Sequence, residues 1–235
     1  MKKVLVTGMS GLIGGLLRSH LDSLDRYDLS ALNRSFVQGV ECHQADISDL
    51  EAIKPVFLNK EVVVHLSADS SGGDWTKLLN ANIVGTYNVY EAARLAGVKR
   101  IVFASSCMVS RGFQYVAPYD AIARGDYDKV PKDFEKITHD MMRPMSVYGA
   151  TKVWGEALGR HYSDAYGISI ICLRLGTLWP DDRPRVDERR KMQEYANYMG
   201  HRDCVQVIEK AIEAPDDLMY DIFYVDSDNR WSYKD

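Results

Sequence analysis

Short apolar runs alternate with longer amphipathic stretches along most of the chain. Val4–Thr7 and Val62–Leu66 are short, apolar and rich in valine, which predicts strands covered on both faces. Leucines at helical spacing predict an amphipathic helix over Leu12–Leu24, and Trp75–Ala96 is a second predicted helix, ended by Gly97. Further strands are predicted at Tyr27–Leu32, Val40–Gln44, Arg100–Ser105 and Ile168–Leu175, and further helices at Asp49–Phe57 and Val147–Tyr166. This alternating order predicts a parallel α/β sheet with helices on both faces.

Two segments break the alternation. Gly112–Met145 contains three prolines and many charges, so we expect a long excursion with short helical pieces. Trp179–Lys191 is also predicted to be loop-like. Long ordered excursions in compact domains often cover an active site.

Composition narrows the class of protein. The chain has 235 residues, enough for one domain, with 46% hydrophobic and 26% charged residues. These shares exclude a disordered chain and a membrane-spanning one. The net charge of −4 gives no basic field for nucleic acid and no reason to expect binding to a membrane surface.

Cysteine and histidine usage points to a reduced compartment without a metal site. The four cysteines, Cys42, Cys107, Cys172 and Cys204, include no CxxC pair, and the six histidines show no metal-ligand spacing. The N-terminal apolar run is too short for a signal peptide. We therefore expect a cytoplasmic protein that needs no metal, with His65 as a structural residue.

A glycine-rich turn follows the first predicted strand. Gly8, Gly11 and Gly14 stand where the chain must turn tightly, where its backbone must approach a pyrophosphate, and where helix and strand must pack closely. The following helix then offers free N–H groups to the phosphates. The alternative is an ordinary tight turn between strand and helix. The pattern favours a dinucleotide site in a Rossmann-type doubly wound sheet, with Ser10, Leu12 and Ile13 as further cofactor-binding residues.

The end of the second strand bears on the choice between NAD and NADP. An acidic residue there would repel a 2′-phosphate, but Asn33 and Arg34 stand in its place. NADP is therefore slightly favoured, although Arg34 as a solvated loop residue or a stack on adenine is the alternative. Asp46 and Ile47 are expected beside the adenine, and the alternative for Asp46 is the N-cap of the next helix.

Tyr148 and Lys152 carry the strongest chemical signal. Residues four apart share a helix face, so the phenol and the ammonium can serve one site, and the cation is expected to lower the pKa of the phenol. Ser106 ends a strand at the carboxyl edge, where α/β sheets bind ligands. Its hydroxyl can donate to a substrate oxygen, and the alternative is a turn or helix-cap serine.

Together these motifs resemble the extended short-chain dehydrogenases/reductases of the NAD-dependent epimerase/dehydratase family. Within it, the chain is similar to uronate dehydrogenases and archaeal-type glucose-6-phosphate dehydrogenases. The likeness covers nearly the whole chain. It rests on TGxxGxxG at 7–14, Asp46, His65-Leu66, Asn82-Ile-Val-Gly85-Thr86, Ser105-Ser106, Tyr148-xxx-Lys152, Gly155-Glu156, Leu173-Arg174-Leu175-Gly176 and His201-Arg202-Asp203-Cys204.

The resemblance implies a role for each matching residue. Tyr148 would be the base for a sugar hydroxyl, supported by Lys152 and by Ser106. The substrate oxidised at C1 would be a uronate or sugar phosphate, and a lactone would form. The resemblance assigns substrate contacts to Ser70, Ser106, Cys107 and Arg174, and cofactor contacts to Leu66, Ser67, Ala68, Asn82, Tyr148 and Lys152.

The resemblance also implies an organisation. Residues 1–175 would form the NAD(P)-binding part with the catalytic residues, and 176–235 a small substrate-binding portion of the same unit, shorter than in relatives. A homodimer is expected. Cys107-Met108 departs from the Asn-His of the uronate enzymes, and a structural role is the alternative for Arg174. Two other functions stay open: a nucleotide-sugar 4-epimerase, and a non-catalytic NADP-sensing protein.

Overall fold

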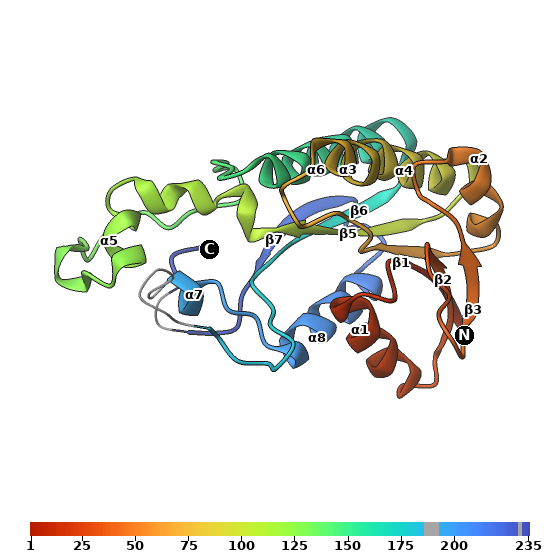
Figure 1. Ribbon diagram of the computed structural model, residues 1–235, viewed down its shortest axis with the longest axis horizontal. Coiled ribbons are helices and arrows are strands. Elements are labelled where there is room, and N and C mark those ends of the chain that lie inside the picture. The colour runs from red at the N-terminus through yellow and green to blue at the C-terminus, as the bar shows by residue number, and fades with distance from the viewer. Residues whose placement is uncertain (186–192, 230–231) are drawn as a thin grey trace.

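A seven-stranded parallel sheet forms the middle layer of the protein (Figure 1). In this computed structural model, which describes residues 1–185, 193–229 and 232–235, the strand order is β3-β2-β1-β4-β5-β6-β7. The strands are β1 (Lys2–Thr7), β2 (Tyr27–Asn33), β3 (Glu41–Gln44), β4 (Val62–His65), β5 (Arg100–Ser106), β6 (Ser169–Leu175) and β7 (Tyr220–Val225). The order reverses between β1 and β4, as in a doubly wound sheet. The predicted fold class is confirmed.

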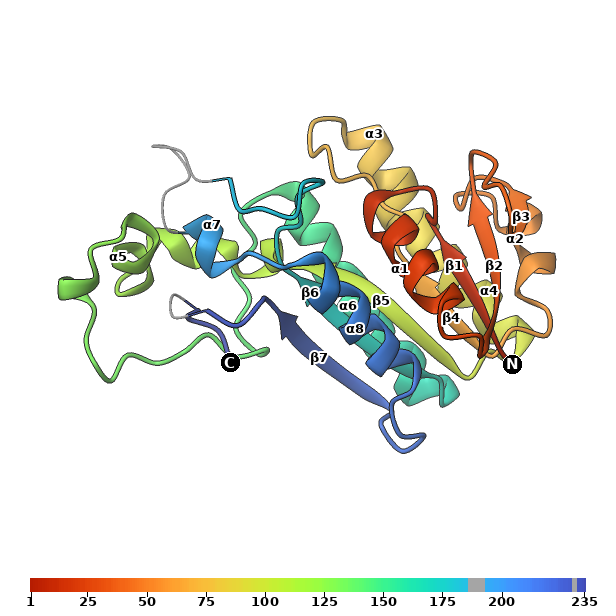
Figure 2. The ribbon, with the colours of Figure 1, turned by 90° about the horizontal axis from the view of Figure 1, so that it is seen from below.

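Helices cover both faces of the sheet. α1 (Leu12–Asp22) and α8 (His201–Ile212) lie on one face, as the view from below shows (Figure 2). The opposite face carries α2 (Leu50–Ile53), α3 (Trp75–Leu78), α4 (Gly85–Ala96) and α6 (Val147–Tyr166). Each layer buries its own apolar cluster, the first around Leu17 and Ile208 and the second around Phe103 and Tyr162. None of the helices within the described ranges is long and apolar enough to cross a membrane.

The long helix predicted over Trp75–Ala96 is interrupted. Leu79–Val84 forms a π-helical segment, η2, between α3 and α4. Such segments widen a helix locally and are frequent at functional sites. Gly97 ends α4 with φ of 73°, as predicted. The helix predicted over Asp49–Phe57 is likewise divided into α2 and the 3-10 helix η1 (Lys54–Phe57).

Residues 176–235 add α7 (Gln193–Ala196), α8 and β7, three elements that the sequence did not predict. α8 packs beside α1, and β7 pairs in parallel with β6. Residues 1–175 and 176–235 therefore contribute to the same sheet, because β6 of the first range is hydrogen bonded to β7 of the second. The loop predicted over Trp179–Lys191 is described only to residue 185, and the rest of it lies outside the described residues.

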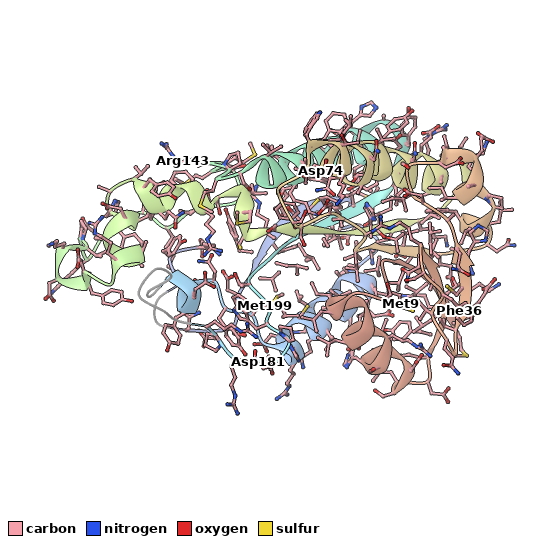
Figure 3. All side chains as sticks on the ribbon, in the orientation of Figure 1. Met9, Phe36, Asp74, Arg143, Asp181 and Met199 are labelled. Carbon is pink, nitrogen blue, oxygen red and sulfur yellow. The ribbon has the colours of Figure 1, made fainter. Side chains whose placement is uncertain are left out.

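The excursion predicted over Gly112–Met145 is present at the carboxyl edge of the sheet, on the left of Figure 1. It contains α5 (Tyr119–Arg124) and the 3-10 helices η4 (Arg111–Tyr115) and η5 (Tyr127–Lys129). Its two ends meet where Gly112 N–H donates to the Arg143 carbonyl at 2.9 Å, and Arg143 is labelled in Figure 3. Its middle is bound to the C-terminal residues, because Ile137 N–H donates to the Tyr233 carbonyl at 2.9 Å. Near it lies the short α7 (Gln193–Ala196).

Candidate active site

A cleft of about 730 Å³ opens at the carboxyl ends of β1, β2, β3 and β4. This is the position where open α/β sheets bind ligands. Most residues predicted to bind the cofactor line it, together with Ser70, which was predicted to bind substrate. The predicted residues on its wall are Gly8, Ser10, Gly11, Asn33, Arg34, Asp46, Ile47, Leu66, Ser67, Ala68 and Ser70.

The glycine-rich turn has the geometry that a pyrophosphate site needs. Gly8 has φ of +76°, and a Cβ there would lie 2.8 Å from the Ser67 nitrogen. A Cβ on Gly14 would lie 2.5 Å from the Met9 Cα, so only glycine permits this packing. Gly11 is the N-cap of α1 and supplies no side-chain hydrogen bond, which leaves the first N–H groups of the helix for an anion.

Asn33 fits the adenosine end of a dinucleotide. Its side chain is only 4% exposed, and neither amide atom has a hydrogen-bond partner among the described residues. Buried amides normally have hydrogen-bond partners, so the Asn33 amide is available to a ligand that can both donate and accept a hydrogen bond. Arg34, the next residue, is exposed on the same wall. The residues present therefore fit NAD(P), and the polar groups at this end would meet the adenosine ribose.

Asp46 is exposed on the wall of the cleft and accepts hydrogen bonds from Ser48 N–H and Ser48 Oγ, at 2.9 and 2.8 Å. The alternative role as the N-cap of the next helix is wrong, because Asp49 caps α2 through Ala52 N–H. Asp46 instead orders the turn that precedes that helix.

Several cleft residues were missed by the sequence analysis. Three of them, Leu32, Ser35 and Ala45, are neighbours of predicted residues at the ends of β2 and β3, and the others come from the segment after β4 and from α3 and η2. Lys77 is the one cation among them; it pairs at 3.9 Å with Asp74, the N-cap of α3 (Figure 3). The missed lining residues are Leu32, Ser35, Ala45, Asp69, Ser71, Lys77, Asn80 and Ala81. Leu12 and Ile13, which were predicted, instead begin α1 beside the turn.

Ser106 and Tyr148 meet at the carboxyl end of β5. Ser106 is the last residue of that strand, and Tyr148 lies in the first turn of α6. Burial raises the pKa of Tyr148 to about 12, and a hydrogen bond with Ser106 acts in the opposite direction. The expected lowering of this pKa is therefore wrong for the protein by itself, because the loss of solvent outweighs the nearby polar groups. Ser106 also caps a short 3-10 helix, since its Oγ accepts from Met108 N–H at 3.2 Å.

Lys152 lies one helical turn from Tyr148 and is only 4% exposed. Its Nζ donates to the Ala104 carbonyl at 2.7 Å and lies 5.7 Å from the centre of the Tyr148 ring. Burial lowers the pKa of Lys152 to about 8, while the carboxylate of Glu156 opposes this shift. The ammonium thus lies next to the Tyr148 ring, as the spacing in the sequence predicted.

Asn82 orders the site from within the π-helical segment. Its Nδ2 donates to the Asp69 carbonyl and to Thr151 Oγ1, at 2.9 and 3.0 Å, and its Oδ1 accepts from Asp69 N–H at 2.8 Å. The side chain therefore connects the wall of the cleft with α6. Asn82 is 2% exposed, so in the structure its side chain serves to hold the wall of the cleft to α6.

The structure places Arg174 away from any open surface. The guanidinium is completely buried, and it binds both carboxylate oxygens of Glu156 at 2.9 Å and the Tyr224 hydroxyl at 2.7 Å. The alternative, a structural arginine, fits this geometry, because each of the three guanidinium nitrogens of Arg174 already has a partner. Cys107 is also buried, at 3% exposure, so its thiol is not part of an open wall.

His65 is buried at the end of β4, which agrees with the structural role that we expected for it. Thr7 Oγ1 accepts from Ser67 N–H at 3.1 Å and lies 2.8 Å from His65 Nδ1, while His65 Nε2 lies 3.3 Å from Thr86 Oγ1. Burial, aided by the charge of Lys152, lowers the pKa of His65 to about 3, so the ring is neutral. A neutral ring therefore links the first turn with α4.

Comparison with known proteins agrees with this geometry. The family model for the NAD dependent epimerase/dehydratase family matches residues 4–211. An L-arabinose 1-dehydrogenase (NAD(P)(+)) of Haloferax volcanii is 34% identical over 220 residues, covering 91% of this chain and 84% of its own length. An NAD-dependent glucose-6-phosphate dehydrogenase of the same organism is 32% identical and covers 98% of this chain and 87% of its own.

Solved structures extend the likeness to the whole chain. The uronate dehydrogenase from Agrobacterium tumefaciens superposes with a TM-score of 0.82 at 29% identity, over 100% of this chain and 80% of that one. A mutant of that enzyme was solved in complex with NAD. The relatives are NAD-dependent sugar dehydrogenases of the extended short-chain type, which confirms the resemblance inferred from the motifs. The chain belongs to the NAD dependent epimerase/dehydratase family.

Proposed function

We propose that the protein is an NAD(P)-dependent dehydrogenase that oxidises a sugar or sugar acid at C1 to a lactone. The arrangement of Ser106, Tyr148 and Lys152 at the carboxyl edge, beside a cleft suited to a dinucleotide, carries this proposal. Similarity to dehydrogenases of arabinose, glucose 6-phosphate and uronates supports it.

In the proposed reaction, Tyr148 removes the proton from the C1 hydroxyl. Ser106 orients that hydroxyl, and the ammonium of Lys152 favours the phenolate that receives the proton. NAD(P)⁺ bound in the cleft would supply the acceptor for the hydride of C1, and its positive charge would add to that of Lys152. Because burial raises the pKa of Tyr148 to about 12 in the protein by itself, these two charges supply the stabilisation that the phenolate needs.

We propose NADP as the slightly favoured cofactor. Arg34 is exposed on the cleft wall, where a guanidinium can pair with a 2′-phosphate, and no carboxylate ends β2 to repel one. Asn33 can serve either cofactor through its unpartnered amide. Equal rates with NAD⁺ and NADP⁺ at limiting concentrations would reject this preference without affecting the dehydrogenase assignment.

For the substrate, Ser70 and Ser106 remain proposed contacts. Ser70 is exposed on the wall of the cleft and Ser106 meets Tyr148. Arg174 is engaged with Glu156, so any anionic group of the sugar would need a different cation. A neutral pentose therefore belongs in the substrate panel beside uronates and sugar phosphates.

The test is a substrate panel with both cofactors. Purified protein is mixed with NAD⁺ or NADP⁺ and with L-arabinose, glucuronate, galacturonate, glucose 6-phosphate or a UDP-sugar, and nicotinamide reduction is followed by absorbance. Reduction with a free sugar that is abolished in Tyr148→Phe supports the proposal. Interconversion of a UDP-sugar without net reduction would instead indicate a nucleotide-sugar 4-epimerase. Tight NADP binding with no conversion at all would favour the sensing protein.

We also propose a cytoplasmic homodimer that associates through α4 and α6. These helices pack side by side and expose Tyr87, Leu95 and Trp154, large apolar side chains that a partner could cover. Light scattering after size-exclusion chromatography tests the dimer, and Trp154→Glu is expected to give monomers. The cytoplasmic location rests on the cysteines, all of which are free, and fractionation of cells tests it.

A further inference from the structure

We propose that Glu156 is a positioning residue of this site: through Ser105 and Arg174 it holds the end of β5, and with it Ser106, against the helix that carries Tyr148 and Lys152. This inference rests on the proposed function, because the residues it positions are the proposed catalytic ones. Glu156 is 2% exposed and touches no open surface of the protein.

One face of α6 contacts the end of β5 through three side chains on successive helical turns. Tyr148, Lys152 and Glu156 are spaced four residues apart, so they lie on one face of the helix. Tyr148 is hydrogen bonded with Ser106, and Lys152 donates to the Ala104 carbonyl at 2.7 Å. The third contact is made by Glu156, whose Oε1 accepts from Ser105 Oγ at 2.5 Å. Each of the last three residues of the strand is therefore held by α6.

A row of side chains across three strands holds Glu156 itself. Ser105 of β5 is in register with Arg174 of β6, and Arg174 is in register with Tyr224 of β7. Register partners in parallel strands point to the same face, here toward α6. Arg174 binds Glu156 through two nitrogens at 2.9 Å and the Tyr224 hydroxyl through the third at 2.7 Å. A bidentate pair of this kind fixes direction as well as distance.

The position of the carboxylate distinguishes it from an ordinary buried ion pair. Buried pairs contribute little net stability compared with well-packed apolar residues, so stability alone does not require one here. Glu156 instead combines two tasks, because it accepts from Ser105 beside Ser106 and places a negative charge one turn from Lys152.

The charge of Glu156 acts on Lys152 among a small set of neighbours. Tyr148 lies on the same helix, while His65 of β4 and Cys172 of β6 face the ammonium from the sheet. Burial lowers the pKa of Lys152, and the Glu156 carboxylate opposes that effect. Replacing the carboxylate by an amide leaves Arg174 as an uncompensated cation. The pKa of Lys152 then falls further and the phenolate of Tyr148 forms at lower pH, so the whole pH profile moves down.

Three variants separate the hydrogen bond from the charge. Ser105→Ala removes only the bond and is expected to lower kcat by about 10- to 100-fold with an unchanged pH profile. Glu156→Gln keeps an acceptor for Ser105 but moves the pH profile of kcat down by about one unit. The double variant Glu156→Leu with Arg174→Met removes both members of the ion pair together, so neither is left as an unpaired buried charge; it is expected to fold and to lose kcat while cofactor affinity stays unchanged.

Arg100→Gln is the matched control. This arginine is 5% exposed at the amino end of the same strand, where it donates to the Ala214 and Pro215 carbonyls at 2.5 and 2.7 Å. Its loss should lower the melting temperature without moving the pH profile. A double variant that folds and shows the wild-type kcat and pH profile would overturn the inference.

A readout without turnover separates the two proposals. If the wild-type protein oxidises no sugar, the proposed function fails, and the NMR titration of the Lys152 side chain then tests Glu156 directly. Its midpoint should be lower in Glu156→Gln than in the wild type, and equal midpoints reject the positioning role. If that variant does not fold, the NMR chemical shifts of the Tyr148 ring in Ser105→Ala decide in its place: they should differ from those of the wild type, and equal shifts reject the positioning role.

Discussion

The carboxyl edge of the sheet is built in two different ways. Beside β1, β2 and β4 the wall of the cleft is open and relies on glycine backbone and exposed side chains such as Arg34 and Asp46. Beside β5, β6 and β7 the important side chains are buried and paired: Lys152 is 4%, Glu156 2% and Arg174 0% exposed. The first half depends on backbone shape, which suits reversible binding. The second depends on fixed charges, which suits proton transfer.

Tyr148→Phe should separate the two halves most clearly. The variant keeps the ring but lacks the proposed base, so kcat should fall by about 100- to 10,000-fold. Tyr148 is not among the residues that line the cleft, so the dissociation constant for NADPH, measured by fluorescence titration, should change little. A parallel loss of cofactor binding would show that the halves are not independent.

Gly14→Ala should damage the open half through its backbone. The added Cβ would lie 2.5 Å from the Met9 Cα, and forced overpacking of this kind costs about 1–3 kcal/mol. Both the melting temperature and the affinity for NADPH should fall. Gly15→Ala is the control, because a Cβ there would meet nothing within 4 Å apart from the backbone of its own helix, and it should leave the stability of α1 unchanged or increase it.

Acid should weaken the junction between the halves through His65. Burial lowers the pKa of His65 from 6.5 to about 3, so the unfolded chain takes up a proton between these values that the folded protein does not. The contribution is fully present above pH 6.5 and is lost as the pH falls, by roughly 2 kcal/mol at pH 5. Urea unfolding at pH 7 and pH 5 should show a smaller difference in His65→Gln than in the wild type. An exposed histidine variant, His161→Gln, should behave like the wild type.

Arg34→Gln should have the smallest effect, confined to the open half. Removing one exposed guanidinium should weaken binding of NADP⁺ by about 10-fold, with NAD⁺ unchanged. Arg160→Gln, on the exposed side of α6, is the control for the change in net charge. Equal weakening of both cofactors would indicate that Arg34 contacts a group that NAD⁺ and NADP⁺ share.

Much of the open half could be predicted from local spacing in the sequence. Gly8 and Gly14 could be placed from sequence because each lies in one strand–turn–helix unit, where neighbours in the chain are neighbours in space. The pairing of Tyr148 with Lys152 was predictable for the same reason. Asp69 was not, because it lies in a segment without periodicity, and Lys77 was not, because a predicted helix does not by itself show which of its side chains line a cleft.

The buried half depends on contacts between layers, which spacing does not show. Glu156 and Arg174 lie 18 positions apart, on a helix and on a strand, and only their packing reveals that each satisfies the other. The direction of the pKa shift of Tyr148 was likewise missed, because helical spacing reports proximity to a cation and not the loss of solvent. β7 was missed because an edge strand resembles an exposed segment when its partner β6 is not known.

The row of Ser105, Arg174 and Tyr224 also has a consequence for assembly. Residues along β6 alternate between the two faces of the sheet, and Leu173 and Leu175 face the apolar layer beneath α8. If β6 added to β5 one position out of step, Arg174 would point into that layer and Glu156 would lose its partner. Each unpaired buried charge costs several kcal/mol, whereas a slip among valines and leucines alone would cost far less. We therefore expect the ion pair to disfavour a sheet in which β6 is out of register with β5.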